Sequence, residues 1–174
     1  DDAAPSKPHS KYAIVSVAAG SGVVEMFKGL RAEYIISGGQ TMNPSTEDFT
    51  ALIESINADH IFILPNNSNI IMAANQAKDL LEDKDIHVIE TRTIPQGLSA
   101  CVMFNPDVEI EENLEEMRDA VAHTKTGQVT YAIKDTTFES LEIKANDFMG
   151  ILEKDIVVTN ASHIEKTHES IAKL

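Results

Sequence analysis

The stretch SGGQTMNPSTED, residues 37–48, decides the fold of this chain because it joins two elements of different kinds. The apolar residues 34–36 before it predict a strand, which ends at a pair of glycines. After a polar turn, Pro44 suits the first turn of a helix, and Ser45 and Asp48 have the spacing of a capping box. The stretch therefore predicts a strand, a tight turn and a helix, in that order.

The same order of elements repeats through the first two thirds of the chain. Nearly continuous apolar runs predict buried strands, and apolar residues with a period of 3.6 predict the helices that follow them. Alternating strands and helices with short links favour the α/β class, with a parallel sheet and flanking helices. The expected strands are 11–18, 34–37, 60–64 and 86–90, and the expected helices are 23–30, one that carries Phe49 to Ile56, 70–81, 97–104 and 113–124.

A different pattern begins after Gly127. Residues 128–133 alternate between apolar and polar, and parts of 141–143 and 148–152 do the same, which predicts a small antiparallel annex of β-hairpins. The tail, residues 162–174, has the pattern of a helix that is cut off. We therefore expect a linker at 1–10, an α/β domain at 11–126, and the β-hairpin annex with a truncated C-terminal helix at 127–174.

Composition argues against several classes of function. The chain has 174 residues and a formal net charge of −14, which argues against nucleic acid or an anionic membrane surface as a direct partner. No apolar run approaches the roughly 20 residues of a membrane span, so membrane insertion is not expected. The single cysteine, Cys101, lies in an apolar run and is expected to be a buried, unreactive thiol of a cytoplasmic protein.

Polar loops follow all four predicted strands. Ligands of an open parallel sheet bind beyond the carboxyl ends of its strands, so these loops are expected to converge on one edge. Their glycine N–H groups, amides, hydroxyls and one arginine could hold a carboxylate or a phosphate, although the same residue types also form simple turns. The candidate ligand- or partner-binding residues are Gly38, Gly39, Gln40, Thr41, Asn43, Ser45, Asn66, Asn67, Arg92 and Thr93.

The sequence carries no recognisable catalytic or metal-binding pattern. It shows no nucleophile paired with a base, and the Gly-Ser-Gly of residues 20–22 is too short for a phosphate-binding or dinucleotide-binding loop. None of the six histidines pairs with another at metal-ligand spacing. We therefore expect no catalytic residue and no metal ligand in this chain.

Four motifs carry a resemblance to a known family. They are SGGQTMNPSTEDF, ILPNNSNIIMAANQA, TRTIPQGLSA and GQVTYAIKDTTF, which begin at residues 37, 63, 91 and 127. Together they resemble the C-terminal region of the catalytic subunit of bacterial fatty acid kinase, a DhaL-domain (DAK2) protein family. The similarity extends from about residue 11 to about residue 158. That region of the family is related to the DegV-like fatty-acid-binding proteins, so the resemblance implies a DegV-like sheet.

The resemblance also implies a division of labour. In that family a DhaL-type domain binds ATP with magnesium and transfers the phosphoryl group, and the C-terminal region docks a DegV-like protein that carries the fatty acid. ATP and magnesium are therefore expected outside this chain, which has no cofactor of its own. The carriers have a Thr-Ser-Gln-Pro-Ser loop, and the sequence TMNPS from Thr41 to Ser45 is its analogue here, with Asn43 at the place of the glutamine.

These observations leave three hypotheses about function. The first is a recruitment module, meaning a domain that docks the DegV-like carrier so that a kinase domain elsewhere phosphorylates the fatty acid to an acyl phosphate. The second is a small-ligand domain that binds a fatty acid or an anion without catalysis. The third, an enzyme such as a phosphatase or acyl transferase, lacks a nucleophile–base pair. The acidic runs 82–85 and 109–116 could dock a basic partner, and a homodimer could form through domains outside this chain.

Overall fold

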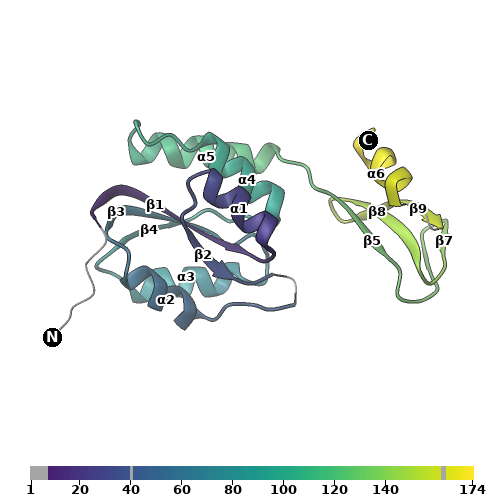
Figure 1. Cartoon of the computed structure of the whole chain (residues 1–174), viewed down its shortest axis with the longest axis horizontal. Coiled ribbons are helices and arrows are strands. Elements are labelled where there is room, and N and C mark those ends of the chain that lie inside the picture. The colour runs from purple at the N-terminus through teal and green to yellow at the C-terminus, as the bar shows by residue number, and fades with distance from the viewer. Residues whose placement is uncertain (1–7, 40, 162–163) are drawn as a thin grey trace. The chain divides into compact units, whose positions relative to one another are not determined.

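The computed structural model describes residues 8–39, 41–161 and 164–174. The chain divides into two compact units, the first ending at Thr124 and the second beginning at Lys125 (Figure 1). This division falls two residues before the boundary expected from the sequence. Within the described residues, no helix combines the length and the apolar character needed to cross a bilayer.

A parallel sheet of four strands forms the centre of the first unit, as the sequence predicts. The strands lie in the order β2-β1-β3-β4. Because β2 and β3 lie on opposite sides of β1, the chain reverses its winding direction there, and the carboxyl ends of β1 and β3 flank the switch point at which such sheets bind ligands. The strands are β1 (Ser10–Ala18), β2 (Tyr34–Ser37), β3 (Ala58–Leu64) and β4 (Asp85–Val88).

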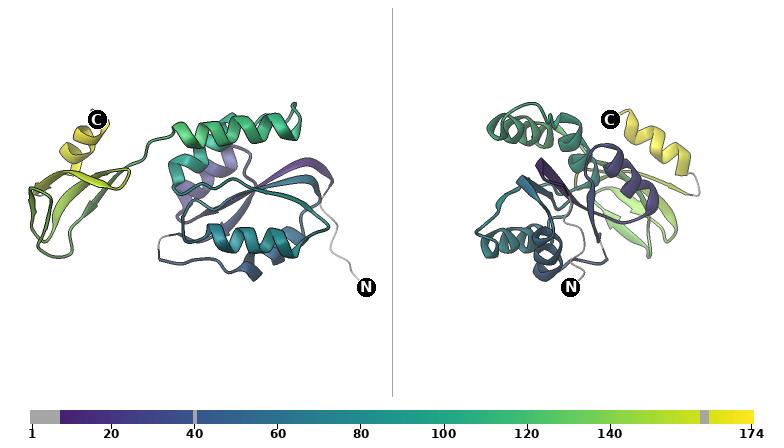
Figure 2. Two further views of the ribbon diagram at one scale, coloured as in Figure 1. Left: turned by 180° about the vertical axis from the view of Figure 1, so that it is seen from behind. Right: turned by 60° about the vertical axis from the view of Figure 1, so that its left-hand side comes forward.

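Helices cover both faces of this sheet, as both views in Figure 2 show. One face packs against α2 (Thr46–Glu54) and α3 (Ile71–Leu80), and its core includes Phe49 and Ile53. The other face packs against α1, α4 and α5, and its core includes Phe27 and Phe62. Burial on both faces explains why the strand sequences read as continuous apolar runs. The helices of this second face are α1 (Ser21–Gly29), α4 (Ile94–Met103) and α5 (Ile110–His123).

The second unit is a small antiparallel structure with one helix. Its three-stranded sheet has the order β5-β8-β9, and β6 and β7 form a separate hairpin. The side chain of Ile171 on α6 lies over two glycines of the sheet, since a Cβ added at Gly127 or Gly150 would lie 2.5 Å or 2.7 Å from it. The elements are β5 (Gly127–Tyr131), β6 (Thr136–Phe138), β7 (Leu141–Ile143), β8 (Asp147–Leu152), β9 (Asp155–Ala161) and α6 (Ile164–Ala172).

The antiparallel annex predicted from the sequence is confirmed, but two of its strands were not expected. Residues 136–138 form β6, although a three-residue strand is too short to show a period. Residues 155–161 form β9, where the apolar run Ile156 to Val158 hides any alternation. Pairing with a neighbouring strand, rather than local pattern, therefore defines both strands.

Candidate functional site

The capping box predicted at the start of α2 is present. The Ser45 hydroxyl accepts a hydrogen bond from the Asp48 backbone N–H at 3.2 Å, and the Asp48 carboxylate accepts one from the Ser45 N–H at 2.8 Å. Glu47 and Asp48 also place negative charge at the positive end of the helix dipole. The N–H groups of Ser45 and Asp48 at the start of α2 thus already have side-chain acceptors, and two carboxylates lie nearby. This helix start is therefore a poor binding site for a further anion.

Two backbone hydrogen bonds between Gly39 and Met42 close the glycine loop between β2 and α2. The Gly39 N–H donates to the Met42 carbonyl at 2.9 Å, and the Met42 N–H donates back at 3.4 Å. Gly38 is buried, and a Cβ there would lie 2.7 Å from Pro44 Cδ, so position 38 has no room for a side chain. Gln40, a predicted site residue, lies outside the described residues. The tip that faces solvent consists of Thr41, Met42 and Asn43.

Asn66 follows β3 and is the central residue at the carboxyl ends of the sheet strands, which we call the switch-point edge. Its side chain is buried. It has a left-handed backbone with φ of 58°, a conformation that asparagine tolerates better than most residues. Its side-chain amide donates to the Ser16 hydroxyl and to the Val17 carbonyl, both at 2.9 Å. Its amide oxygen accepts from the Thr91 hydroxyl at 2.8 Å, and that hydroxyl accepts from the Asn66 N–H at 2.9 Å. One side chain therefore ties the carboxyl ends of β1, β3 and β4 together.

Helix α4 packs directly on this network. A Cβ added at Gly97 would lie 2.1 Å from the amide oxygen of Asn66, so only glycine fits at this position. Thr93 caps α4 by accepting a hydrogen bond from the Gln96 N–H at 3.2 Å. The Thr93 cap and the proline in the first turn explain why α4 begins at Ile94, three residues before the start expected from the sequence.

The remaining predicted residues lie at the surface of the edge. Arg92 is 53% exposed at its side chain, and its guanidinium lies 3.4 Å from the Glu90 carboxylate. Asn67 is half-buried, and its amide oxygen accepts from the Asn69 N–H at 2.9 Å in a local turn. The structure thus separates the predicted site residues into a hydrogen-bonded framework around Asn66 and an exposed rim that includes Thr41, Asn43 and Arg92.

The thiol of the first unit is buried, and two hydroxyls of this edge take part in hydrogen bonds of the fold. The one cysteine of the first unit lies on α4, and burial raises the pKa of the Cys101 thiol to about 12. A thiol with such a pKa stays protonated near neutral pH and is no nucleophile. The hydroxyls of Ser45 and Thr91 already serve as acceptors within the fold.

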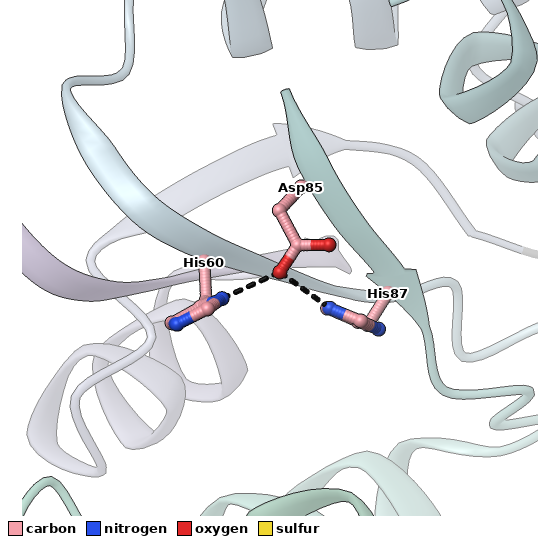
Figure 3. Close-up of side chains that lie close together, drawn as sticks. All are labelled: His60, Asp85 and His87. Carbon is pink, nitrogen blue, oxygen red and sulfur yellow. Dashed lines mark hydrogen bonds and ion pairs between the residues drawn. The ribbon is translucent and has the colours of Figure 1, made fainter. Parts of the chain in front are cut away.

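Sequence reasoning missed one cluster at the opposite end of the sheet. His60, Asp85 and His87 offer ligand atoms within 4.8 Å of one another (Figure 3). His60 lies on β3 and the other two lie on β4, so the cluster exists only because these strands are neighbours. The available signal was the two-residue spacing of Asp85 and His87, which puts both side chains on one face of a strand.

Comparisons with known proteins agree with this architecture. The chain is 50% identical to protein YloV of Bacillus subtilis (strain 168) over 153 residues, which are 88% of this chain and 28% of YloV. It is 41% identical to an uncharacterised protein of Staphylococcus aureus (strain USA300) over 172 residues, which are 99% of this chain and 31% of that protein. The chain therefore spans less than a third of the length of these relatives.

A solved structure shares the fold. It is the hypothetical protein TM841 from Thermotoga maritima, described as revealing a fatty acid binding function. The TM-score is 0.62 at 14% sequence identity, and the similarity covers 95% of this chain and 76% of that protein. A family model for the C-terminal region of FakA-like fatty acid kinase subunits matches residues 13–174. The chain belongs to this FakA-like C-terminal family.

Proposed function

We propose that this chain is a recruitment module of a fatty acid kinase. It docks a DegV-like fatty-acid-binding protein, so that a kinase domain of the longer polypeptide can phosphorylate the bound fatty acid to an acyl phosphate. Family membership supports the link to fatty acid kinase, and the chain's short span relative to YloV fits a single module of a larger protein. Holding a carrier in place supplies orientation, which is a large part of the advantage of a positioned reaction.

One observation carries the docking part of the proposal: polar side chains at the carboxyl ends of the strands, the switch-point edge, form hydrogen bonds with other groups of the chain. The Asn66 amide and the Thr91 hydroxyl bond to each other, and the Ser45 hydroxyl caps a helix. Such an edge has a fixed shape and presents its rim outward. Met42 on the glycine loop is 57% exposed, and Met72 in the first turn of α3 is 71% exposed. Exposed methionine is typical of protein-binding surfaces.

Electrostatics supports a partner with a basic face. The net charge of the chain is −14, and the first half of α5 carries four glutamates between Ile110 and Met117. Long-range attraction of this kind accelerates association and weakens as salt screens it. Reversal of charge along this part of α5 should therefore slow association with the carrier.

In this proposal the chain performs no phosphoryl transfer itself. ATP and magnesium bind to the kinase domain, and this chain contributes the surface that holds the carrier. The proposed place of action is the cytoplasm.

Titration calorimetry with a purified DegV-like carrier tests the proposal. We expect binding that weakens by about tenfold or more in Met42→Glu, because a charge replaces an apolar contact at the interface. The control is Leu80→Glu, which changes an exposed apolar residue, 69% exposed against 57% for Met42, at the C-terminal end of α3 and away from the glycine loop. Binding that is absent for the unmodified chain, or that is weakened equally by both variants, would contradict the proposed docking edge.

A second function, binding of a small anion or fatty acid, has one observation in its favour. Helix α1 begins at the switch point after Gly20, and within the described residues its first turn has neither a side-chain cap nor an acidic residue. Free N–H groups at a helix start favour an anion. Mass spectrometry of extracts of the purified chain distinguishes the two functions, since a competent acyl site should retain a fatty acid and a docking edge should not.

A further inference from the structure

The histidine–aspartate cluster lies away from the switch-point edge. His60 is the third residue of β3, and Asp85 is the first residue of β4. At about 3.3 Å per residue, His60 lies about 13 Å from the carboxyl end of β3 at Leu64. Neither the sequence motifs nor the proposed docking function gives this cluster a role.

Strand register brings the three side chains together. His60 pairs with Asp85 across β3 and β4, and Phe62 pairs with His87. Since side chains alternate between the faces of a strand, His60, Asp85 and His87 all project from one face of the sheet. Figure 3 shows both imidazole rings turned toward the same carboxylate.

The donor atoms converge on one oxygen. Asp85 Oδ2 lies 2.5 Å from His60 Nδ1 and 2.8 Å from His87 Nε2, and all three ligand atoms lie within 4.8 Å of one another. Partial burial opposes ionisation of Asp85, but the hydrogen bonds from the two histidines lower the pKa of its carboxyl below the ordinary value. An aspartate is ordinarily ionised at neutral pH, so the cluster offers a carboxylate oxygen.

Aromatic neighbours hold both rings in place. The centroid of His60 lies 5.4 Å from that of Tyr12, and the centroid of His87 lies 6.2 Å from that of Phe62. Tyr12 is itself fixed, because its hydroxyl donates to the Val108 carbonyl at 2.6 Å. The side chains of His60, Asp85 and His87 remain 24%, 47% and 21% exposed, so an ion can reach them from solvent. The ligand set is thus arranged in advance and open.

We propose that His60, Asp85 and His87 form a binding site for a divalent d-block metal ion, with zinc as the ion to be tested. Two imidazole nitrogens and one carboxylate oxygen are a ligand set that suits zinc, whereas calcium and magnesium require oxygen ligands. Three protein ligands leave the fourth tetrahedral position to water.

The geometry is close to what zinc needs. Bond lengths of about 2.0–2.2 Å in a tetrahedron place ligand atoms about 3.3 Å apart. Each nitrogen must therefore move less than about 1 Å away from Asp85 Oδ2, and the two nitrogens, which lie within 4.8 Å of each other, must approach by at most about 1.5 Å. The ion takes the place of the protons that now bridge His60 and His87 to Asp85. Each neutral ring then carries its proton on its other nitrogen, as metal-bound histidines do.

Zinc binding to the chain, stripped with a chelator and free of any histidine tag, tests the site. We expect one zinc per chain by calorimetry, a higher Tm with zinc, and visible absorption bands of tetrahedral cobalt when Co²⁺ is used as the probe. His60→Asn and His87→Asn should each weaken zinc binding at least about tenfold and abolish the cobalt bands.

The matched control is His123→Asn. His123 is an exposed histidine 3.3 Å from the Asp119 carboxylate, but it belongs to no group of three ligands within the described residues. This variant should bind zinc and cobalt like the unmodified chain. Zinc binding that survives unchanged in His60→Asn and His87→Asn, or a chain that binds no zinc while circular dichroism shows it folded, overturns the proposal.

Discussion

Asn66 and Gly97 share one small space at the carboxyl edge of the sheet. A Cβ added at Gly97 would lie 2.1 Å from the Asn66 amide oxygen, a separation that no pair of real non-bonded atoms maintains. Helix α4 can approach the ends of β1, β3 and β4 only because residue 97 has no side chain. The position of the helix and the hydrogen bonds of the asparagine therefore depend on each other.

Gly97→Ala should lower the free energy of unfolding of the first unit by about 3 kcal/mol, because the added methyl group displaces the Asn66 amide from its buried partners. Gly29→Ala is the control, since a Cβ at the end of α1 meets no atom within 4 Å. Hydrogen exchange of the β3 amides in urea measures both changes. A Gly97→Ala chain as stable as the Gly29→Ala chain would show that the close approach has no energetic role.

Replacements of Asn66 separate the energy of its side-chain hydrogen bonds from the cost of its left-handed backbone. Asn66→Ala should cost about 4 kcal/mol, because it strands the buried Ser16 and Thr91 hydroxyls and forces alanine into a left-handed backbone. Asn66→Gly should cost about 1 kcal/mol less, since glycine adopts φ of 58° freely. Asn146→Ala removes an exposed asparagine with φ of 70° and should cost only the backbone part. Equal losses of unfolding free energy in all three variants would show that the hydrogen bonds of Asn66 do not contribute to stability.

Gly150→Ala should destabilise the second unit by about 2 kcal/mol, because a Cβ there would lie 2.4 Å from Val158 and 2.7 Å from Ile171. Loss of hydrogen-exchange protection in β8 and β9 reports the effect. Ile133→Ala is the control, since its side chain is 85% exposed and its loss should change stability by less than about 0.5 kcal/mol. A similar effect of the two changes would mean that α6 does not pack on this glycine.

Cys101 should resist thiol reagents in the folded chain. Burial raises the pKa of its thiol from the ordinary 9.0 to about 12, so the thiolate is scarce at neutral pH. Because the folded pKa is the higher one, the stability that this group contributes is complete below pH 9 and is lost between pH 9 and 12. Cys101 is the only cysteine, so the rate of labelling by an aromatic disulfide reports on it alone. Labelling should be roughly 100-fold slower in buffer than in urea, and equal rates would contradict the burial.

The sequence predicts this fold well where local chemistry decides the structure. The capping box of Ser45 and Asp48 depends on residues three apart, and the structure contains it. Each of the four parallel strands can be recognised from its own apolar run in the sequence. Elements of this kind need no information from distant parts of the chain.

The arrangement of the site depends on strand order and register, which local patterns do not encode. Asn66 has the polarity of a ligand-binding residue, yet its amide bonds to Ser16 on β1 and to Thr91 in the loop after β4. His60 and His87 are 27 positions apart in the sequence and become neighbours only when β3 pairs with β4. Both features follow from the order β2-β1-β3-β4, which short-range patterns leave open.

The Asn66 network also has a consequence for the order of folding. Its hydrogen bonds join residues that are 25, 49 and 50 positions apart, so they close only after three strands have assembled. Contacts of such long sequence separation are expected to form late, after the folding transition state. Loss of Asn66 should then accelerate unfolding far more than it slows folding. A half-folded chain would lack the finished edge, so under the proposed docking function a partner would meet that surface only on molecules that have completed folding.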